Sequence, residues 1–275
     1  MPTVRALSLR STASWRRARN RLLPALLPLL LLGAAQAREQ LTVCFDDWAP
    51  YAAFTPDRGY HGLTLELMRE VFAELDVGLR FQSATQSRCA AAARAGKIDV
   101  MLFADRELLP AGWRSTQVPT EFWLVGAWVQ AGSPQVRYER IEQFRGARVA
   151  MVTDYLYPEP IAGYRAWRPV MVGDAIDGLR QLSARRVDVQ FEDVLWGRDK
   201  QRELGLKIRL LQPLVAAQPQ LHWYHPDAAP LMQRYEQAVQ ALIRGGELEA
   251  RYRAAIGLSY DAIRRGDYGA VFVAP

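Results

Sequence analysis

Residues 184–193 read ARRVDVQFED, and residues 95–100 read AGKIDV. In both stretches the end of a helix pattern is followed by a strand pattern that begins with Ile or Val, then Asp, then Val. Each stretch stands at the corresponding place in a run of alternating strands and helices. The sequence therefore predicts one α/β construction used twice, in two lobes.

The chain around residues 95–100 predicts the first lobe. Its strand patterns alternate with amphipathic helix patterns, which favours a doubly wound, mainly parallel sheet with right-handed crossovers. Residues 46–61, between the first strand and the first helix, are rich in Pro, Asp, Gly and aromatic residues. Such a loop follows the end of a strand, where open α/β sheets bind ligands. The expected strands are 41–45, 79–82 and 98–103, and the expected helices are 62–75 and 88–95.

The chain around residues 184–193 predicts the second lobe. An apolar run at 122–129 is typical of a strand that leaves the first lobe, and residues 220–225 are typical of a strand that returns to it. We therefore expect a two-strand hinge, with lobe 1 in residues 38–128 and 223–275 and lobe 2 in residues 129–222. In lobe 2 we expect strands at 148–152, 169–172 and 187–191 and helices at 138–144, from Ile161 and at 175–184; two last helices, 229–244 and 247–256, should pack on lobe 1.

Residues 1–37 have the three parts of a secretory signal peptide. Six arginines and no Lys, Asp or Glu are followed by the apolar run 22–32 and by Ala35-Gln36-Ala37. The alternative is a membrane anchor, but the apolar stretch of about 16 residues contains two prolines and is shorter than a span requires. We expect export to the periplasm with cleavage after Ala37.

The charge of the chain lies in this leader. The formal net charge is +6, but six of the 35 basic residues belong to residues 1–37, which leaves 29 basic against 29 acidic residues. A neutral mature chain gives no reason to expect a nucleic-acid partner. With half of its residues apolar, the chain can bury the cores of two modest lobes.

The two cysteines, Cys44 and Cys89, both lie in the first lobe. In an oxidising compartment an even pair is compatible with a structural disulfide. Two buried free thiols are the alternative, because Cys packs well as a small apolar residue. The sequence leaves both open.

Six short sequence motifs, in the order found in that family, resemble the bacterial extracellular solute-binding proteins of family 3, the periplasmic receptors of polar amino-acid ABC transporters. The resemblance covers nearly the whole mature chain. It implies a type II periplasmic binding protein: two hinged α/β lobes that close over a small polar solute and then meet an ABC permease or a membrane sensor. The motifs are Trp48-Ala49-Pro50-Tyr51, residues 62–67, residues 96–100, residues 144–150, residues 186–193 and Gly245-Gly246-Glu247-Leu248.

The resemblance also implies ligand-binding residues. Asp193 matches the acidic residue that takes the ammonium group of the ligand, although it can equally serve as a helix N-cap. Trp48 matches the aromatic residue that covers one face of the ligand, and ordinary packing beneath the loop is its alternative. Tyr51 and Asp47 are weaker neighbours.

This sequence departs from the family where the ligand carboxylate is held. Small hydroxyl residues are replaced by Phe103 and its neighbours, and Arg106 and Arg114 compete for the role of the anion-binding arginine. For Arg106 an ion pair with Asp105 or Glu107 is the alternative. In lobe 2 a Gly-Thr-Thr-like turn is replaced by residues that include Asp154 and Tyr155, which disfavour a carboxylate and narrow the cleft. The solute is therefore expected to be aromatic, amine-bearing or not an amino acid.

Other classes of function fit less well. A dehydratase-like enzyme needs a positioned acid or base, for which Asp154, Glu192 and Asp193 are the candidates. A metal site at His222 and His225 lacks a ligand pattern, and we expect no metal and no cofactor. A periplasmic sensor would have the same lobes as a transport receptor. We expect a monomer that is not an enzyme.

Overall fold

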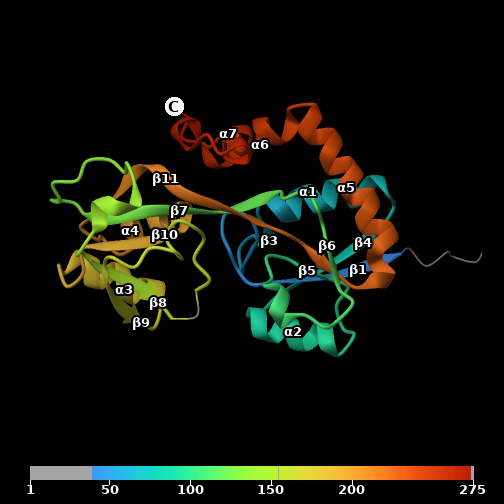
Figure 1. Ribbon diagram of the computed structural model, residues 1–275. Coiled ribbons are helices and arrows are strands. Elements are labelled where there is room, and N and C mark those ends of the chain that lie inside the picture. Colours follow the sequence, from blue (N-terminus) through green and yellow to red (C-terminus); the bar gives the residue numbers. More distant parts are fainter. Residues whose placement is uncertain (1–38, 154, 274–275) are drawn as a thin grey trace, which may run out of the picture. The chain divides into compact units, whose positions relative to one another are not determined.

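The computed structural model describes residues 39–153 and 155–273, which form two α/β lobes (Figure 1). The expected signal peptide, residues 1–37, and the candidate residue Asp154 lie outside the described residues. Each lobe is built around a five-stranded sheet flanked by helices. The predicted two-lobed α/β fold is confirmed.

The sheet of the first lobe has the strand order β4-β1-β5-β12-β6. Strand β1 is parallel to both β4 and β5, whereas β12 is antiparallel to β5 and β6. The prediction of a mainly parallel sheet therefore holds for its first three strands, and the returning chain adds an antiparallel edge. The strands are β1 (Gln40–Phe45), β4 (Gly78–Ser83), β5 (Val100–Met101), β6 (Arg114–Ser115) and β12 (Trp223–Tyr224).

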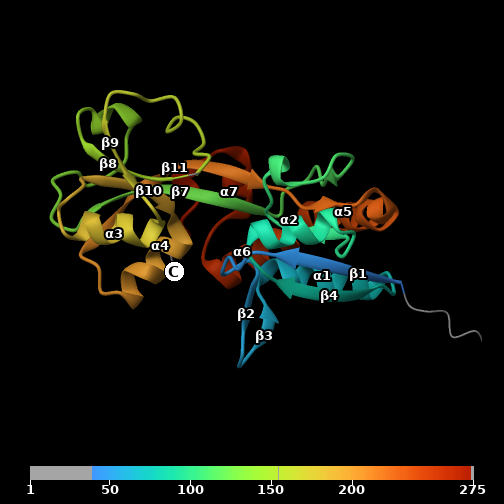
Figure 2. The same cartoon turned by 90° about the horizontal axis from the view of Figure 1, so that it is seen from below.

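Helix α1 (Leu63–Glu74) buries one face in the first lobe, because its apolar residues recur at helical spacing. Gly62 precedes it with a φ of 119°, and a Cβ there would lie 2.4 Å from the carbonyl oxygen of Tyr51. Only glycine fits this close approach, which ties the preceding loop to the start of the helix. Helix α2 (Gln86–Arg94) covers the same sheet, where it contacts β5 and lies beside β1 (Figure 2).

The last helices pack on the first lobe, as the sequence predicts. Helices α5 (Ala229–Arg244) and α6 (Glu247–Ile256) have the predicted bounds. The ring of Tyr235 stacks on that of Phe72 in α1, with 5.4 Å between the ring centroids. A further helix, α7 (Tyr260–Arg265), follows, and the short 3-10 helices η3 (Pro226–Ala228) and η4 (Tyr268–Ala270) flank this group.

The sheet of the second lobe has the order β11-β7-β10-β8-β9. Strand β10 is parallel to β8, and β8 is parallel to β9, while β7 runs antiparallel to β10 and β11. The strands are β7 (Glu121–Gln130), β8 (Arg148–Val152), β9 (Arg168–Val172), β10 (Val189–Asp193) and β11 (Ile208–Gln220), and the helices are α3 (Ala175–Ser183) and α4 (Val194–Glu203).

Strands β7 and β11 carry the chain from one lobe to the other and back (Figure 1). They pair with each other from Gln130 opposite Ile208 to Glu121 opposite Gln220. Because β7 pairs within the second sheet along its length, the expected lobe boundary at residue 128 falls inside this strand. The chain rejoins the first sheet at β12, which begins at residue 223.

Several predicted elements differ from the structure. The expected helix at 138–144 is only the 3-10 turn η2 (Ile141–Phe144), and the residues after Ile161 form turns, where Gly163 disfavours a helix. Most of β11 was not expected, because Pro213 and polar residues interrupt its apolar pattern. The loop at 46–61 contains the hairpin β2 (Ala53–Thr55) and β3 (Gly59–His61), and η1 (Arg106–Leu108) follows β5.

Within residues 39–153 and 155–273, no helix combines the length and the apolar character needed to cross a membrane.

Candidate functional site

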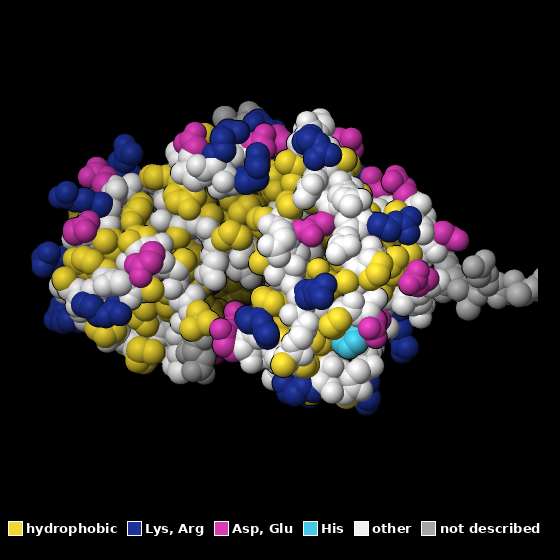
Figure 3. Space-filling view, turned by 45° about the vertical axis from the view of Figure 1, so that its right-hand side comes forward, with side chains coloured by type: hydrophobic (Ala, Val, Ile, Leu, Met, Phe, Trp, Pro, Cys, Tyr) yellow, Lys and Arg dark blue, Asp and Glu magenta, His cyan; other side chains and the backbone are white. Residues whose placement is uncertain are grey.

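A pocket with a volume of about 310 Å³ lies between the two lobes. The space-filling view shows the surface hollowed near its centre (Figure 3). Both lobes and the returning strand β11 contribute to the wall of the pocket. The first lobe supplies Asp46, Asp47, Trp48, Gln86, Phe103 and Asp105; the second lobe supplies Trp123, Tyr155, Leu156, Glu192, Asp193 and Trp196; and β11 supplies Gln218 and Gln220.

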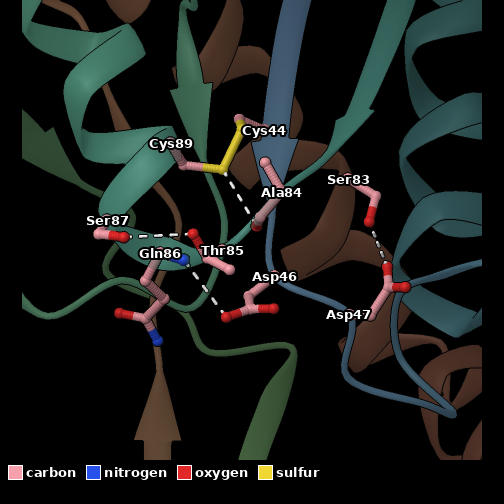
Figure 4. Close-up of a disulfide and its surroundings, with 9 residues drawn as sticks. All are labelled: Cys44, Asp46, Asp47, Ser83, Ala84, Thr85, Gln86, Ser87 and Cys89. Carbon is pink, nitrogen blue, oxygen red and sulfur yellow. Dashed lines mark hydrogen bonds between the residues drawn. A yellow bond between two sulfur atoms is a disulfide. The ribbon is translucent and has the colours of Figure 1, made fainter.

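The first-lobe wall is built where β1 ends. Asp46 and Asp47 follow the last residue of this strand, at the carboxyl edge of the parallel strands. The backbone N–H of Gln86 donates to Oδ2 of Asp46 (3.3 Å), and the hydroxyl of Ser83 donates to Oδ1 of Asp47 (2.7 Å) (Figure 4). Partial burial raises the pKa of Asp46. The start of α2 therefore holds one of these carboxylates in place.

A disulfide between Cys44 and Cys89 joins β1 to α2 just behind this wall (Figure 4). Their Cα atoms lie 5.7 Å apart, and both residues are buried. The structure thus decides between the alternatives that the sequence left open. The bridge connects the strand that leads into Asp46 with the helix that carries Gln86, so it supports the pocket without lining it.

Trp48 lines the pocket and also packs on the core, and its contact with a ligand stays a prediction. Its ring lies 5.0 Å from that of Phe103, at an interplanar angle of 86°, and 4.7 Å from that of Tyr51. Phe103 lines the pocket as predicted. Tyr51 is fully buried beneath Trp48, and the structure does not bring it to the pocket wall.

Asp193 is the central residue of the second-lobe wall. It ends β10 and caps α4, where its Oδ1 accepts a hydrogen bond from the backbone N–H of Trp196 (2.8 Å). Its Oδ2 has no hydrogen-bond partner among the described residues, although the relative solvent exposure of Asp193 is only 3%. Burial raises the pKa of Asp193 to about 7, against the opposing effect of nearby backbone N–H groups. The cap is observed, and the binding of an ammonium group stays a prediction.

Glu192 is a second buried carboxyl beside Asp193. Its Oε1 accepts a hydrogen bond from the backbone N–H of Asp193 (2.8 Å), and its Oε2 accepts one from Gln190 (3.3 Å). Burial raises the pKa of Glu192 to about 8, and the neighbouring carboxyl of Asp193 contributes to this rise. Next to them, the ring of Tyr155 meets that of Trp123 edge to face, with centroids 5.6 Å apart.

Neither predicted arginine lies at the pocket. The guanidinium of Arg106 lies 5.4 Å from the centre of the Trp223 ring, on an exposed segment. Arg114 stands opposite Tyr224 at the edge of the first sheet. None of the described residues that line the pocket is Lys or Arg.

Sequence reasoning missed several lining residues, chiefly Trp123, Trp196 and the glutamines of β11. Trp123 and the glutamines lie on the two crossing strands, whose position between the lobes depends on tertiary pairing. One signal in the sequence could have indicated Trp123. The predicted strand at 122–129 leaves the first lobe and must pass the cleft, so its first residues are candidates for the pocket wall. From the sequence, Glu192 is predicted only as a candidate acid or base of an enzyme, not as a residue of a ligand-binding wall.

Comparison with known proteins identifies the fold. No protein-family model matches the sequence, and no curated protein matches it. The structure is similar to that of the probable amino-acid ABC transporter extracellular-binding protein ytmK from Bacillus subtilis, with a TM-score of 0.67 and 16% identity over 80% of this chain and 98% of that one.

Two other solved structures are similar. The unliganded, open L-cystine solute receptor of Neisseria gonorrhoeae has a TM-score of 0.60 and 18% identity, over 80% of this chain and 94% of its own. A histidine kinase sensor domain with similarity to periplasmic binding proteins also has a TM-score of 0.60, with 22% identity over 80% and 97% of the two chains. The described part of this chain therefore has the fold of the extracellular solute-binding proteins of amino-acid ABC transporters.

Proposed function

We propose that this protein is a periplasmic solute-binding protein that closes over a small polar solute and delivers it to an ABC transporter. The observation that carries the proposal is the pocket of about 310 Å³, whose wall comes from both lobes and from the strand that connects them. A ligand that contacts both walls stabilises the arrangement in which they approach each other, by its difference in affinity for the two states. The solved structures with the same fold support this function.

The composition of the wall supports binding without catalysis. Among the described residues that line the pocket there is no Ser, Cys, His or Lys, so a Ser–His or Cys–His pair of nucleophile and base is absent from this wall. The buried carboxyls of Glu192 and Asp193 are hydrogen-bonded to the backbone at the start of α4, which suits a fixed wall for a ligand. The leader pattern supports export with cleavage after Ala37, and we propose a monomer.

Sensing is the second candidate function. The similarity to a histidine kinase sensor domain favours it, since the same lobes can close for a membrane sensor instead of a permease. Purified protein that stimulates ATP hydrolysis by a reconstituted permease in the presence of its solute would favour transport. Solute-dependent binding to a membrane kinase would favour sensing.

Closure is tested by combining a thermal-shift screen with small-angle X-ray scattering. Compounds from amines, amino acids, carboxylates and aromatic acids that raise the Tm bind the folded state. We expect each such compound to lower the radius of gyration as well, because the lobes approach when both contact the ligand. Non-binding analogues serve as controls. Tight binding with an unchanged scattering profile would show a rigid site and contradict the proposal.

A further inference from the structure

We propose that the pocket takes a small organic cation that carries N–H donors and no carboxylate, in the chemical class of amines and guanidines. This inference rests on the proposed function, because it names the class of solute for the same pocket. It departs from an α-amino acid, which presents a carboxylate beside its ammonium group. The argument uses the charges of the wall, its free hydrogen-bonding atoms and its aromatic rings.

The wall contains acidic side chains and no basic ones among its described residues. Its first-lobe side carries three acidic side chains and its second-lobe side carries two, with no described Lys or Arg among the lining residues. A cleft lined by one sign of charge raises the local concentration of opposite charge and repels like charge. A cation with charge toward either end thus meets acceptors on both walls. The five side chains are those of Asp46, Asp47, Asp105, Glu192 and Asp193.

The buried wall atoms that lack a hydrogen-bond partner among the described residues are both acceptors. Oδ2 of Asp193 is buried without a donor among the described residues, while its Oδ1 is already bonded to Trp196. The buried Oε1 of Gln218 likewise has no partner in the described chain. A buried acceptor without a donor is costly, so a ligand that supplies N–H groups gains from both atoms. This requirement favours ammonium or guanidinium over a quaternary ammonium group.

The aromatic rings form two corners, one on each lobe. Trp48 and Phe103 meet at 86° in the first lobe, and Trp123 and Tyr155 meet at 89° in the second. Aromatic faces attract organic cations, and right-angled pairs present a face and an edge to the same space. A bare metal ion fits less well, since the described residues contain no cluster of His, Cys, Asp and Glu suited to a metal.

A carboxylate on the ligand would find no Lys or Arg among the described residues of this wall. The two arginines that would hold it stand elsewhere, Arg106 beside Trp223 and Arg114 at a sheet edge. The side-chain amide of Gln86 uses one of its two N–H groups to donate to the carbonyl oxygen of Phe103 (3.3 Å). The acidic side chains of the wall would repel a ligand carboxylate, and such like-charge repulsion strongly disfavours binding.

The test uses pairs of compounds that differ only in the α-carboxylate: agmatine and arginine, putrescine and ornithine, cadaverine and lysine, tyramine and tyrosine. Affinities are measured by isothermal titration calorimetry at pH 8 on protein expressed from the full sequence. We expect the amine of at least one pair to bind at least tenfold more tightly than its amino acid. Choline, which is a cation without N–H groups, should bind more weakly than that amine.

Matched variants locate the effect. Asp193→Asn removes the charge but can still cap α4, because Asn is also a good N-cap, and it should weaken the amine by at least tenfold. The control is Asp174→Asn, which alters the carboxylate that caps α3 and accepts from the backbone N–H of Asp177 (2.7 Å) but does not line the pocket. It should change the affinity less than threefold.

The outcomes separate this inference from the proposed function. If an amino acid binds as tightly as its amine and compacts the protein, the cation assignment is overturned and the proposed function stands. A preference for glutamate, succinate or choline, or binding of the amine that survives Asp193→Asn, also overturns it. If compounds of every charge fail to bind, both proposals fail.

Discussion

At the scale of single residues, the site depends on two carboxyls that are buried side by side at the start of α4. A buried carboxyl loses its hydration, and this cost favours the neutral acid. Backbone N–H groups partly offset the cost, since Asp193 bonds to Trp196 and Glu192 bonds to the N–H of Asp193. The pKa values of about 7 and about 8 follow from this balance. A bound cation would favour the charged forms and lower both pKa values.

The affinity for a cation should therefore depend on pH. In the free protein the carboxyls of Asp193 and Glu192 are protonated below pH 7 to 8, so a cation must displace these protons to bind. Above this range both carboxyls are already ionised. Agmatine stays protonated over this range. We expect its Kd to be at least about tenfold higher at pH 5.5 than at pH 8.5, since each carboxyl contributes up to one decade per pH unit.

Calorimetry over this pH range checks the expectation, and the double variant Asp193→Asn, Glu192→Gln is the control. With both titrating groups removed, the remaining dependence on pH should be small. A wild-type affinity that is constant from pH 5.5 to 8.5 would show that these carboxyls do not meet the ligand's charge.

At the scale of elements, the disulfide connects the strand and the helix that form the first-lobe wall. It closes a loop over a sequence separation of 45, for which chain entropy predicts about 4 kcal/mol of stabilisation. The measured stabilisation can be smaller than this chain-entropy value when the reduced, unfolded chain keeps some structure. The bridge also keeps α2 near β1, where the N–H of Gln86 donates to Asp46.

The double variant Cys44→Ala, Cys89→Ala should lower the free energy of unfolding by roughly 2 to 4 kcal/mol. Urea denaturation followed by circular dichroism gives the value. Wild-type protein in excess reductant is the matched control and should lose a similar amount. If the variant and the oxidised wild type unfold at the same urea concentration, the bridge contributes nothing to stability.

At the scale of the whole described chain, a buried polar cluster marks the place where the two crossing strands meet the first lobe. Glu121 begins β7, and its Oε1 accepts a hydrogen bond from the hydroxyl of Thr64 (2.5 Å). His222 follows β11, and its Nε2 lies 3.5 Å from Oε2 of Glu121. Burial raises the pKa of Glu121 to about 7 and lowers that of His222 to about 3, so the imidazole is neutral at ordinary pH.

This cluster makes stability depend on pH. The pKa of Glu121 is higher in the folded state than its ordinary value of 4.5, so its contribution to stability is complete below pH 4.5 and is lost as the pH rises through 7. The loss amounts to roughly 3 kcal/mol. Glu121→Gln keeps an acceptor for Thr64 and removes the titration, so the variant should gain roughly 2 to 3 kcal/mol relative to the wild type between pH 5 and pH 8.

Urea denaturation of both proteins at pH 5 and pH 8 measures this difference. The exposed substitution Glu139→Gln is the control and should give the same small difference at both values. If the gap between Glu121→Gln and the wild type is equal at pH 5 and pH 8, Glu121 is already ionised in the folded state at pH 5.

The local sequence predicted most of the helices and strands and their order, but not β11. Apolar spacing predicted α1, α5 and α6 within about one residue, because those helices each present one face to a core. The repeated Ile/Val-Asp-Val strands predicted two similar lobes, and the family resemblance indicated Asp193, Trp48, Phe103 and Tyr155, which line the pocket.

Only the tertiary structure decided which other residues meet the strand ends at the pocket. Strand β11 forms because it pairs with β7, despite Pro213 and an interrupted apolar pattern, and this pairing brings Gln218 to the pocket. Arg106 is close in sequence to Phe103 but turns to Trp223, so proximity along the chain did not place its charge at the wall. The net charge of a site depends on side chains from several segments that meet only in the folded chain. The sequence of any one segment therefore does not predict it.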